Sequence, residues 1–131
     1  MKKAFARQTE NYTHRVAIRE HELIVDEPRD NGGDDAGPTP QELLAASLAS
    51  CTAITLEMYA KAKRWDISPV EVACEYVPAE RGTPTTFKIV LKFPEACTHE
   101  QIQKLEVIAA KCPVHRTLAG EVFFEQHVER V

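Results

Sequence analysis

The sequence lacks the spacing of the common metal-binding motifs. None of its four cysteines forms a Cys-x-x-Cys pair, and its five histidines are scattered along the chain. Structural zinc sites are usually built from closely spaced pairs of such ligands. We therefore expect no metal site.

The sequence also lacks an excess of positive charge and a long apolar run. Its formal net charge is −4, which argues against the basic footprint of a nucleic-acid-binding protein. The segment of residues 1–8 is basic but is not followed by an apolar stretch, which argues against a secretory signal. We also expect no segment that spans a membrane. The expectation is a cytoplasmic protein with no nucleic-acid or membrane partner.

The composition is that of a small globular protein. Of the 131 residues, 44% are hydrophobic and 27% are charged, so we expect one domain over residues 1–131 with a core of its own. Structural disulfides are rare in the cytosol. The four cysteines are therefore expected to be free, metal-bound or redox-active.

Alternating apolar and polar residues predict strands. In one such segment, Val16 and Ile18 alternate with Arg15 and Arg19. A polar loop rich in aspartate and glycine, residues 29–38, separates the first three strands from the rest. The six predicted strands cover residues 3–8, 12–19, 21–26, 70–76, 87–93 and 121–131.

A long neutral helix is predicted after the polar loop. Thr39 is a natural N-cap, Pro40 fits the first helical position, and Glu42 completes a capping box. No charged residue occurs from Leu43 to Leu56, which indicates a buried central helix. We expect its apolar stripe to consist of Leu44, Leu48, Cys51, Thr55 and Met58.

A second helix is predicted near the end of the chain. Thr98 and Gln101 form its capping box, and Cys112 lies on its inner face. Pro113 either breaks this helix or begins a new short one. The predicted order is β-β-β-α-β-β-α-β, which is an α+β arrangement.

The four cysteines differ in what their surroundings predict. Cys74, on the packed face of a strand, and Cys97, beside a helix cap and partly exposed, have no partner pattern, and Cys74 is expected to be a small core residue. Cys51, considered without Cys112, would also be interpreted as a small core residue. Cys112 precedes Pro113 at a possible helix start, where backbone N–H groups lower a thiol pKa.

The residues after Cys112 leave two interpretations open. His115 and Arg116 could add positive charge beside the thiol and favour its ionised form. Alternatively, the segment is a kink that ends the second helix, with two solvated side chains.

Two segments carry a resemblance to a known family. They are GPTPQELLAASLASC at residues 37–51 and CPVHRTL at residues 112–118. Together with residues 25–28, the pair Gly32-Gly33 and residues 58–60, they resemble the OsmC/Ohr family over nearly the whole chain and in family order.

The resemblance implies a fold, an activity and partners. The expected fold is OsmC-like, with antiparallel sheets wrapped around two central helices in an intertwined homodimer and with active sites at the subunit interface. The expected activity is the reduction of organic hydroperoxides to alcohols by a thiol peroxidase. In the family the first helix cysteine, here Cys51, is peroxidatic, and the second, here Cys112, is resolving. No cofactor is implied beyond an external thiol reductant of the lipoyl dithiol type.

The sequence departs from the family pattern where the peroxidatic thiol is activated. The better-studied branches use a Glu ten positions before the cysteine, where this chain has Gln41, and an Arg from the N-terminal strands. The residue next to Gln41 is Glu42, which is either a catalytic acid or the capping-box residue.

The activating cation has several candidates. Arg15 and Arg19, which share one face of a predicted strand, are either the family's Arg or ordinary surface charge, and His115 and Arg116 could substitute. The alternative function is a stress-related binding protein with an apolar interfacial pocket and little peroxidase activity.

Overall fold

The computed structural model describes residues 2–131, which divide into two compact units. The first takes in the chain up to Ala46 together with Tyr76–Thr86, and the second takes in Ser47–Glu75 and Phe87–Val131. The α+β arrangement with antiparallel strands is confirmed. The extent of a single domain over residues 1–131 stays a prediction.

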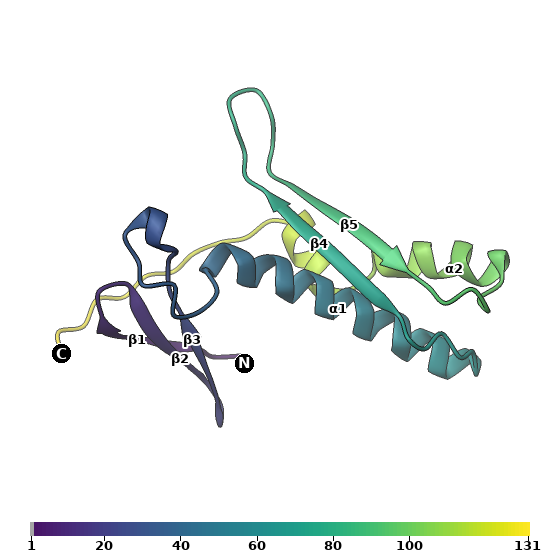
Figure 1. Ribbon diagram of the computed structural model, residues 1–131, viewed down its shortest axis with the longest axis horizontal. Helices are drawn as coiled ribbons and strands as arrows, with labels where there is room; N and C mark the ends of the chain where they lie inside the picture. Colours follow the sequence, from purple (N-terminus) through teal and green to yellow (C-terminus); the bar gives the residue numbers. More distant parts are fainter. Residues whose placement is uncertain (1) are drawn as a thin grey trace. The chain divides into compact units, whose positions relative to one another are not determined.

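The first unit contains a three-stranded antiparallel sheet. Its strands are β1 (Phe5–Glu10), β2 (Thr13–Ile18) and β3 (His21–Val25), in the order β1-β2-β3 (Figure 1). The two connections are two residues long and begin at Asn11 and Arg19, whose φ angles are +46° and +54°. Positive φ is typical of the tight turns that join antiparallel strands.

A buried carboxylate organises the loop after β3. Asp26 accepts hydrogen bonds from the Thr13 hydroxyl at 2.7 Å and from the amides of Glu27 at 2.7 Å and Ala36 at 3.2 Å. Burial raises the pKa of Asp26, but these hydrogen bonds and one from the Asp34 amide outweigh it, so the pKa lies below its ordinary value. The loop contains the short 3-10 helix η1 (Arg29–Asn31).

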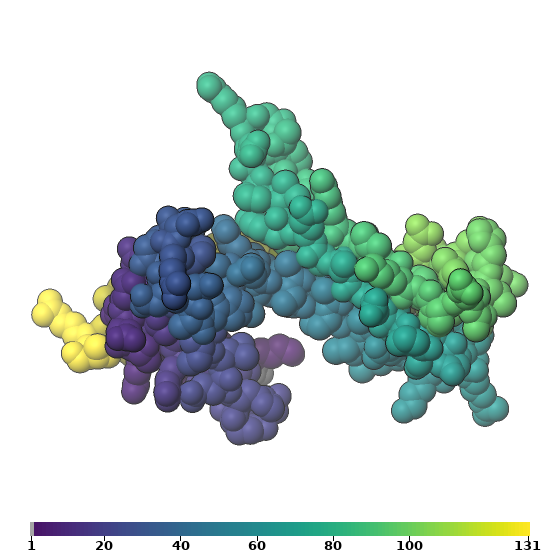
Figure 2. Space-filling model, in the orientation of Figure 1, coloured from purple at the N-terminus to yellow at the C-terminus, as the bar shows by residue number. Residues whose placement is uncertain are grey.

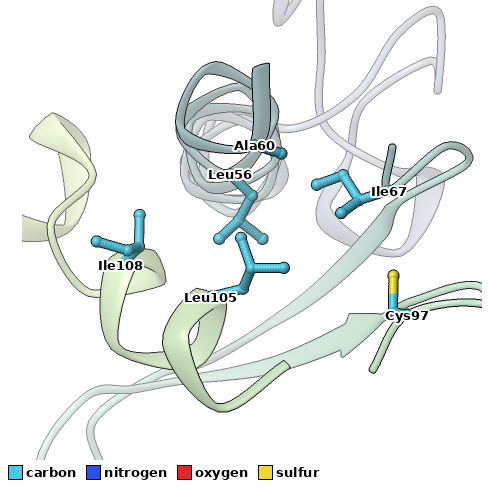
Figure 3. Close-up of a cluster of buried hydrophobic side chains, with 6 residues drawn as sticks. All are labelled: Leu56, Ala60, Ile67, Cys97, Leu105 and Ile108. Carbon is cyan, nitrogen blue, oxygen red and sulfur yellow. The ribbon is translucent and has the colours of Figure 1, made fainter. Parts of the chain in front are cut away.

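The second unit has a core between two helices and a hairpin. Helix α1 (Pro40–Lys63) contributes its C-terminal part, α2 (His99–Ala109) packs against it, and β4 (Glu71–Val77) pairs with β5 (Thr86–Lys92) (Figure 1). The side chains that meet in this core are drawn in Figure 3: Leu56, Ala60, Ile67, Cys97, Leu105 and Ile108.

Both predicted capping boxes are confirmed. The Thr98 hydroxyl accepts from the Gln101 amide at 3.1 Å, and the Gln101 side chain accepts from the Thr98 amide at 2.9 Å. At the start of α1 the same reciprocal pair joins Thr39 and Glu42, at 3.1 Å and 2.9 Å. These bonds satisfy amides that have no partner within the helix.

The surface of α1 corrects two expectations. Leu44 and Met58, placed on the buried stripe by the sequence, are exposed, whereas Leu48 is buried as predicted and is joined in the buried stripe by Thr52, Leu56 and Ala60. Within the described chain, α1 is also long and apolar enough to cross a membrane by length and composition alone, contrary to the expectation. The central helices of soluble proteins share this length and composition. Part of the surface of α1 is visible in Figure 2, in blue to teal.

The end of the chain differs from the predicted strand. Residues 120–131 form no strand, and the Phe123 and Phe124 side chains are 81% and 86% exposed. A strand needs a neighbouring strand for its backbone hydrogen bonds, and this segment has no such partner within the described chain. Pro113 begins the short helix α3 (Pro113–Ala119), which decides between the two roles left open for it.

Candidate functional site

The structure brings Cys51 and Cys112 together within the second unit. All four cysteines are free thiols, and the side chains of Cys51 and Cys112 lie close enough that each shifts the pKa of the other. Cys112 lies after the end of α2, at the N-cap of α3, and not on the inner face of the second helix as predicted. Cys74 and Cys97 stand apart from this pair: Cys74 is half-buried on β4, and Cys97 is buried in the core cluster rather than partly exposed as expected.

Cys51 lies in the middle of α1 at the edge of the buried stripe. It is half-buried, whereas the next residue, Thr52, is fully buried. Burial raises the pKa of the Cys51 thiol, a hydrogen bond from the Val114 amide opposes this, and Cys112 raises the pKa further. The pKa of Cys51 therefore lies above the ordinary value of a thiol.

Cys112 is the N-cap of α3, and its side chain is fully buried. Its sulfur accepts hydrogen bonds from the His115 amide at 3.3 Å and from the Thr52 hydroxyl at 3.8 Å. Burial raises the pKa of Cys112, but the His115 amide, Cys51, Thr52 and the Val114 amide outweigh it, so the pKa is lowered.

Local folding explains where Cys112 sits. Helix α2 ends at Ala109, and the Lys111 and Cys112 amides bond back to the carbonyls of Ile108 and Ala109 at 2.9 Å and 3.4 Å. Pro113 then occupies the first turn of α3, where its missing N–H costs nothing. The chain therefore turns sharply at Cys112 and directs its sulfur toward α1.

The structure gives Glu42 a structural partner. Glu42 is exposed, and its carboxylate accepts from the Thr39 amide at 2.9 Å. This is the capping interpretation of Glu42, and its catalytic role stays a prediction.

The sequence placed the two candidate arginines on one face of a strand, and the structure does not. Arg15 lies in β2 and pairs with Glu22 at 3.4 Å, while β2 ends at Ile18 and Arg19 falls in the turn that follows. Arg19 pairs with Glu20 at 3.6 Å. Both arginines are well exposed, so these ion pairs contribute little to stability.

His115 and Arg116 lie on α3 next to the thiol pair in sequence. His115 acts on Cys112 through its backbone amide, and its side chain is half-buried. Arg116 is exposed. The sequence suggested their side-chain charges, whereas the contact found in the structure is a backbone one.

Thr52 is the site residue that sequence reasoning missed. It lies between Leu48 and Leu56 at a spacing of one helical turn, inside an otherwise apolar stripe. A polar residue at such a position needs a buried partner. That pattern was the available signal, but the partner, Cys112, is 60 residues away.

Apolar clefts are present in each unit. In the second unit, a cleft of about 480 Å³ is lined mostly by β5 and α2, including Leu91, Phe93, Ile102 and His115. In the first unit, a cleft of about 730 Å³ is lined by residues of the sheet, the following loop and the start of α1. Among residues 2–131 no group of three or more His, Cys, Asp or Glu side chains could hold a metal ion.

Comparisons with known proteins identify relatives of this fold. The solved structures that match include an OsmC-like protein from Mycoplasma pneumoniae, with a TM-score of 0.77, 18% identity, and coverage of 92% of this chain and 88% of that one. An organic hydroperoxide resistance protein OsmC from Legionella pneumophila has a TM-score of 0.69, 19% identity and coverage of 92% and 90%.

The organic hydroperoxide resistance protein OhrB of Bacillus subtilis matches with a TM-score of 0.63, 21% identity and coverage of 92% and 91%. A comparison with curated protein sequences gave no match. The family model described as OsmC-like protein matches residues 32–127, which is well over half of the sequence. The chain therefore belongs to the OsmC-like protein family, in agreement with the resemblance carried by its two cysteine segments.

Proposed function

We propose that this protein is a thiol peroxidase that reduces organic hydroperoxides to alcohols with Cys51 and Cys112. The observation that carries the proposal is the proximity of the two thiols, which shift each other's pKa, one half-buried and the other fully buried. Two thiols in contact can be oxidised to one disulfide. Organic hydroperoxide resistance proteins among the structural neighbours support the same reaction.

The difference in exposure supports unequal roles for the two thiols. Cys51 is half-buried and can be approached from solvent, so it is the peroxidatic residue. Cys112 is 0% exposed and cannot meet a peroxide before the site opens, so it is the resolving residue. This division agrees with the roles that the family resemblance implies.

The reaction proceeds in two oxidative steps and one reductive step. The Cys51 thiolate attacks the distal peroxide oxygen, the O–O bond breaks, and the alkoxide leaves as an alcohol after protonation. Cys112 then attacks the sulfur of the Cys51 sulfenic acid, which forms the disulfide and releases water. An external dithiol of the lipoyl type returns the pair to the reduced form.

We infer a cytoplasmic homodimer as the working state. Exposed apolar side chains support a dimer, among them Ile54 and Met58 on α1 and Phe123 and Phe124 near the end of the chain. Such surface is usually covered by a partner. Free thiols throughout the chain fit a reducing compartment.

Disulfide mapping tests the proposed reaction. Reduced protein is mixed with one equivalent of cumene hydroperoxide, and the products are mapped by mass spectrometry. A Cys51–Cys112 disulfide with stoichiometric cumyl alcohol is expected, and Cys51→Ser should abolish both. Cys74→Ser is the matched control and should leave both unchanged. Protein that keeps all four thiols while the peroxide persists would refute the proposal.

A second candidate function is an OsmC-like binding protein with little peroxidase activity. Gln41 favours it, because the better-studied branches have an acid at this position. The two candidates differ in the fate of the peroxide. A binding protein would hold the hydroperoxide unchanged, whereas the enzyme would convert it to alcohol.

A further inference from the structure

The feature that the peroxidase proposal leaves unused is the buried hydroxyl of Thr52. Its side chain is 1% exposed, and it lies on α1 directly after Cys51. The hydroxyl donates to the Cys112 sulfur at 3.8 Å. Burying a hydroxyl is unfavourable unless it is hydrogen-bonded, so this contact fixes where the Thr52 side chain points.

We propose that Thr52 is a positioning residue of the thiol pair: its hydroxyl, together with the His115 amide, holds the Cys112 sulfur as a hydrogen-bond acceptor, so that Cys112 takes the proton of Cys51 before it acts as the resolving thiol. This inference rests on the proposed peroxidase function and deepens it. The same residue would thus set which sulfur carries the charge in the reduced pair.

The number of donors around Cys112 supports this assignment. Thr52 and Cys51 approach from α1, and the amides of His115 and Val114 approach from α3. Several donors that converge on one sulfur fit a thiolate, which only accepts, better than a thiol, which also has a proton to donate. The pKa directions agree, because the pKa of Cys112 is lowered while that of Cys51 is raised.

Proton transfer within the pair would make Cys51 reactive without a neighbouring cation. The Cys51 S–H bond breaks as the Cys112 thiolate takes the proton. The Cys51 thiolate forms an S–O bond to the distal peroxide oxygen, and the O–O bond breaks. The alkoxide takes the proton back from Cys112 and leaves as the alcohol.

The second step uses the Cys112 thiolate, which forms again when Cys112 gives its proton to the alkoxide. Cys112 attacks the sulfur of the Cys51 sulfenic acid, so that the S–S bond forms and the S–O bond breaks. Hydroxide leaves and takes a proton from solvent to become water. The hydroperoxide is the only oxidant in these two steps, and it is reduced to the alcohol.

A matched pair of variants separates the hydroxyl from the shape of Thr52. Thr52→Val keeps the branched shape and removes the hydroxyl, whereas Thr52→Ser keeps the hydroxyl and removes the methyl group. The Cys112 pKa is measured in a Cys51→Ser background from the ultraviolet absorbance of the thiolate. The same titration of the Cys51→Ser/Cys112→Ser protein is subtracted, because it contains the contributions of the remaining cysteines.

Thr52→Val is expected to raise the Cys112 pKa by about half a unit, which lowers the thiolate fraction roughly threefold below the pKa. Thr52→Ser should leave the pKa close to the parent value. Equal pKa values in the two variants would overturn the inference. If Thr52→Val does not fold, Thr52→Ala takes its place in the comparison with Thr52→Ser.

The titration uses no peroxide, so it separates this inference from the proposed function. A protein without peroxidase activity whose Cys112 pKa still depends on the Thr52 hydroxyl would refute the enzyme and not the thiolate assignment. An active peroxidase with an unchanged Cys112 pKa in Thr52→Val would refute the role of Thr52 alone.

Discussion

Replacing Leu105 by alanine tests the packing that holds the thiol pair in place. Leu105 is 0% exposed and lies in the core cluster with Leu56 and Ala60 of α1 (Figure 3). Helix α2 carries the turn that positions Cys112 at its C-terminal end. Loss of this side chain therefore weakens the attachment of α2 to α1.

The expected loss follows from the complete burial of the side chain. Each buried carbon that is removed costs about 0.8 kcal/mol of transfer free energy. The cavity left behind adds to this, so Leu105→Ala should lower the free energy of unfolding by about 3–4 kcal/mol. Since m-values in urea are about 1–3 kcal/mol/M, the unfolding midpoint should fall by roughly 1–4 M.

Urea unfolding followed by circular dichroism, at one fixed protein concentration, measures this loss. Val107→Ala is the control on the same helix, because Val107 is exposed. That variant should change the free energy of unfolding by no more than about 0.5 kcal/mol. Equal losses in the two variants, or a loss below about 1 kcal/mol for Leu105→Ala, would refute the core as described.

Two further predictions concern groups outside the thiol pair. The pKa of Asp26 is lowered in the folded protein, so its contribution to stability is present above the unfolded pKa of about 3.9 and is lost as the pH falls through the lower folded value. Wild-type protein should therefore lose stability in acid more steeply than Asp26→Asn, and parallel acid-unfolding curves would contradict this. Thr98→Ala removes the N-cap hydroxyl of α2 and should cost about 1 kcal/mol in urea unfolding, whereas Thr98→Ser should cost little.

Local signals in the sequence predicted most of the elements. Alternation identified β2, β4 and β5, and the capping boxes at Thr39 and Thr98 identified the starts of α1 and α2, because caps and period-two patterns are local properties. The strand predicted over residues 121–131 was wrong for a related reason. Alternation indicates that a segment can form a strand, but the hydrogen-bonding neighbour is set by the rest of the fold.

The phase of the α1 stripe could not be predicted from composition. Small and apolar residues surround the helix, so periodicity distinguishes its faces poorly. Leu44 and Met58 were placed inside and are exposed, while Thr52 was left out and is buried. The predicted stripe contained Cys51, one position before Thr52, and left out Thr52 itself.

The candidate site illustrates the same limit. Its two cysteines were found through their motifs, and a helix start at Pro113 was one of the two alternatives that the sequence left open. The polar contacts were not, because the Thr52–Cys112 bond joins residues 60 positions apart. Arg19 was wrongly assigned to a strand, because β2 ends one residue earlier than predicted and Arg19 lies in the turn that follows.

Trapping the first oxidised intermediate tests the central claim most directly. In Cys112→Ser the resolving thiol is absent, so one equivalent of cumene hydroperoxide should leave a sulfenic acid on Cys51. Dimedone should then label Cys51 alone, as read by peptide mass spectrometry, and wild-type protein should form the disulfide and resist the label. Label on another cysteine, or no label with the peroxide unconsumed, would contradict the assignment of Cys51 as the residue that meets the peroxide.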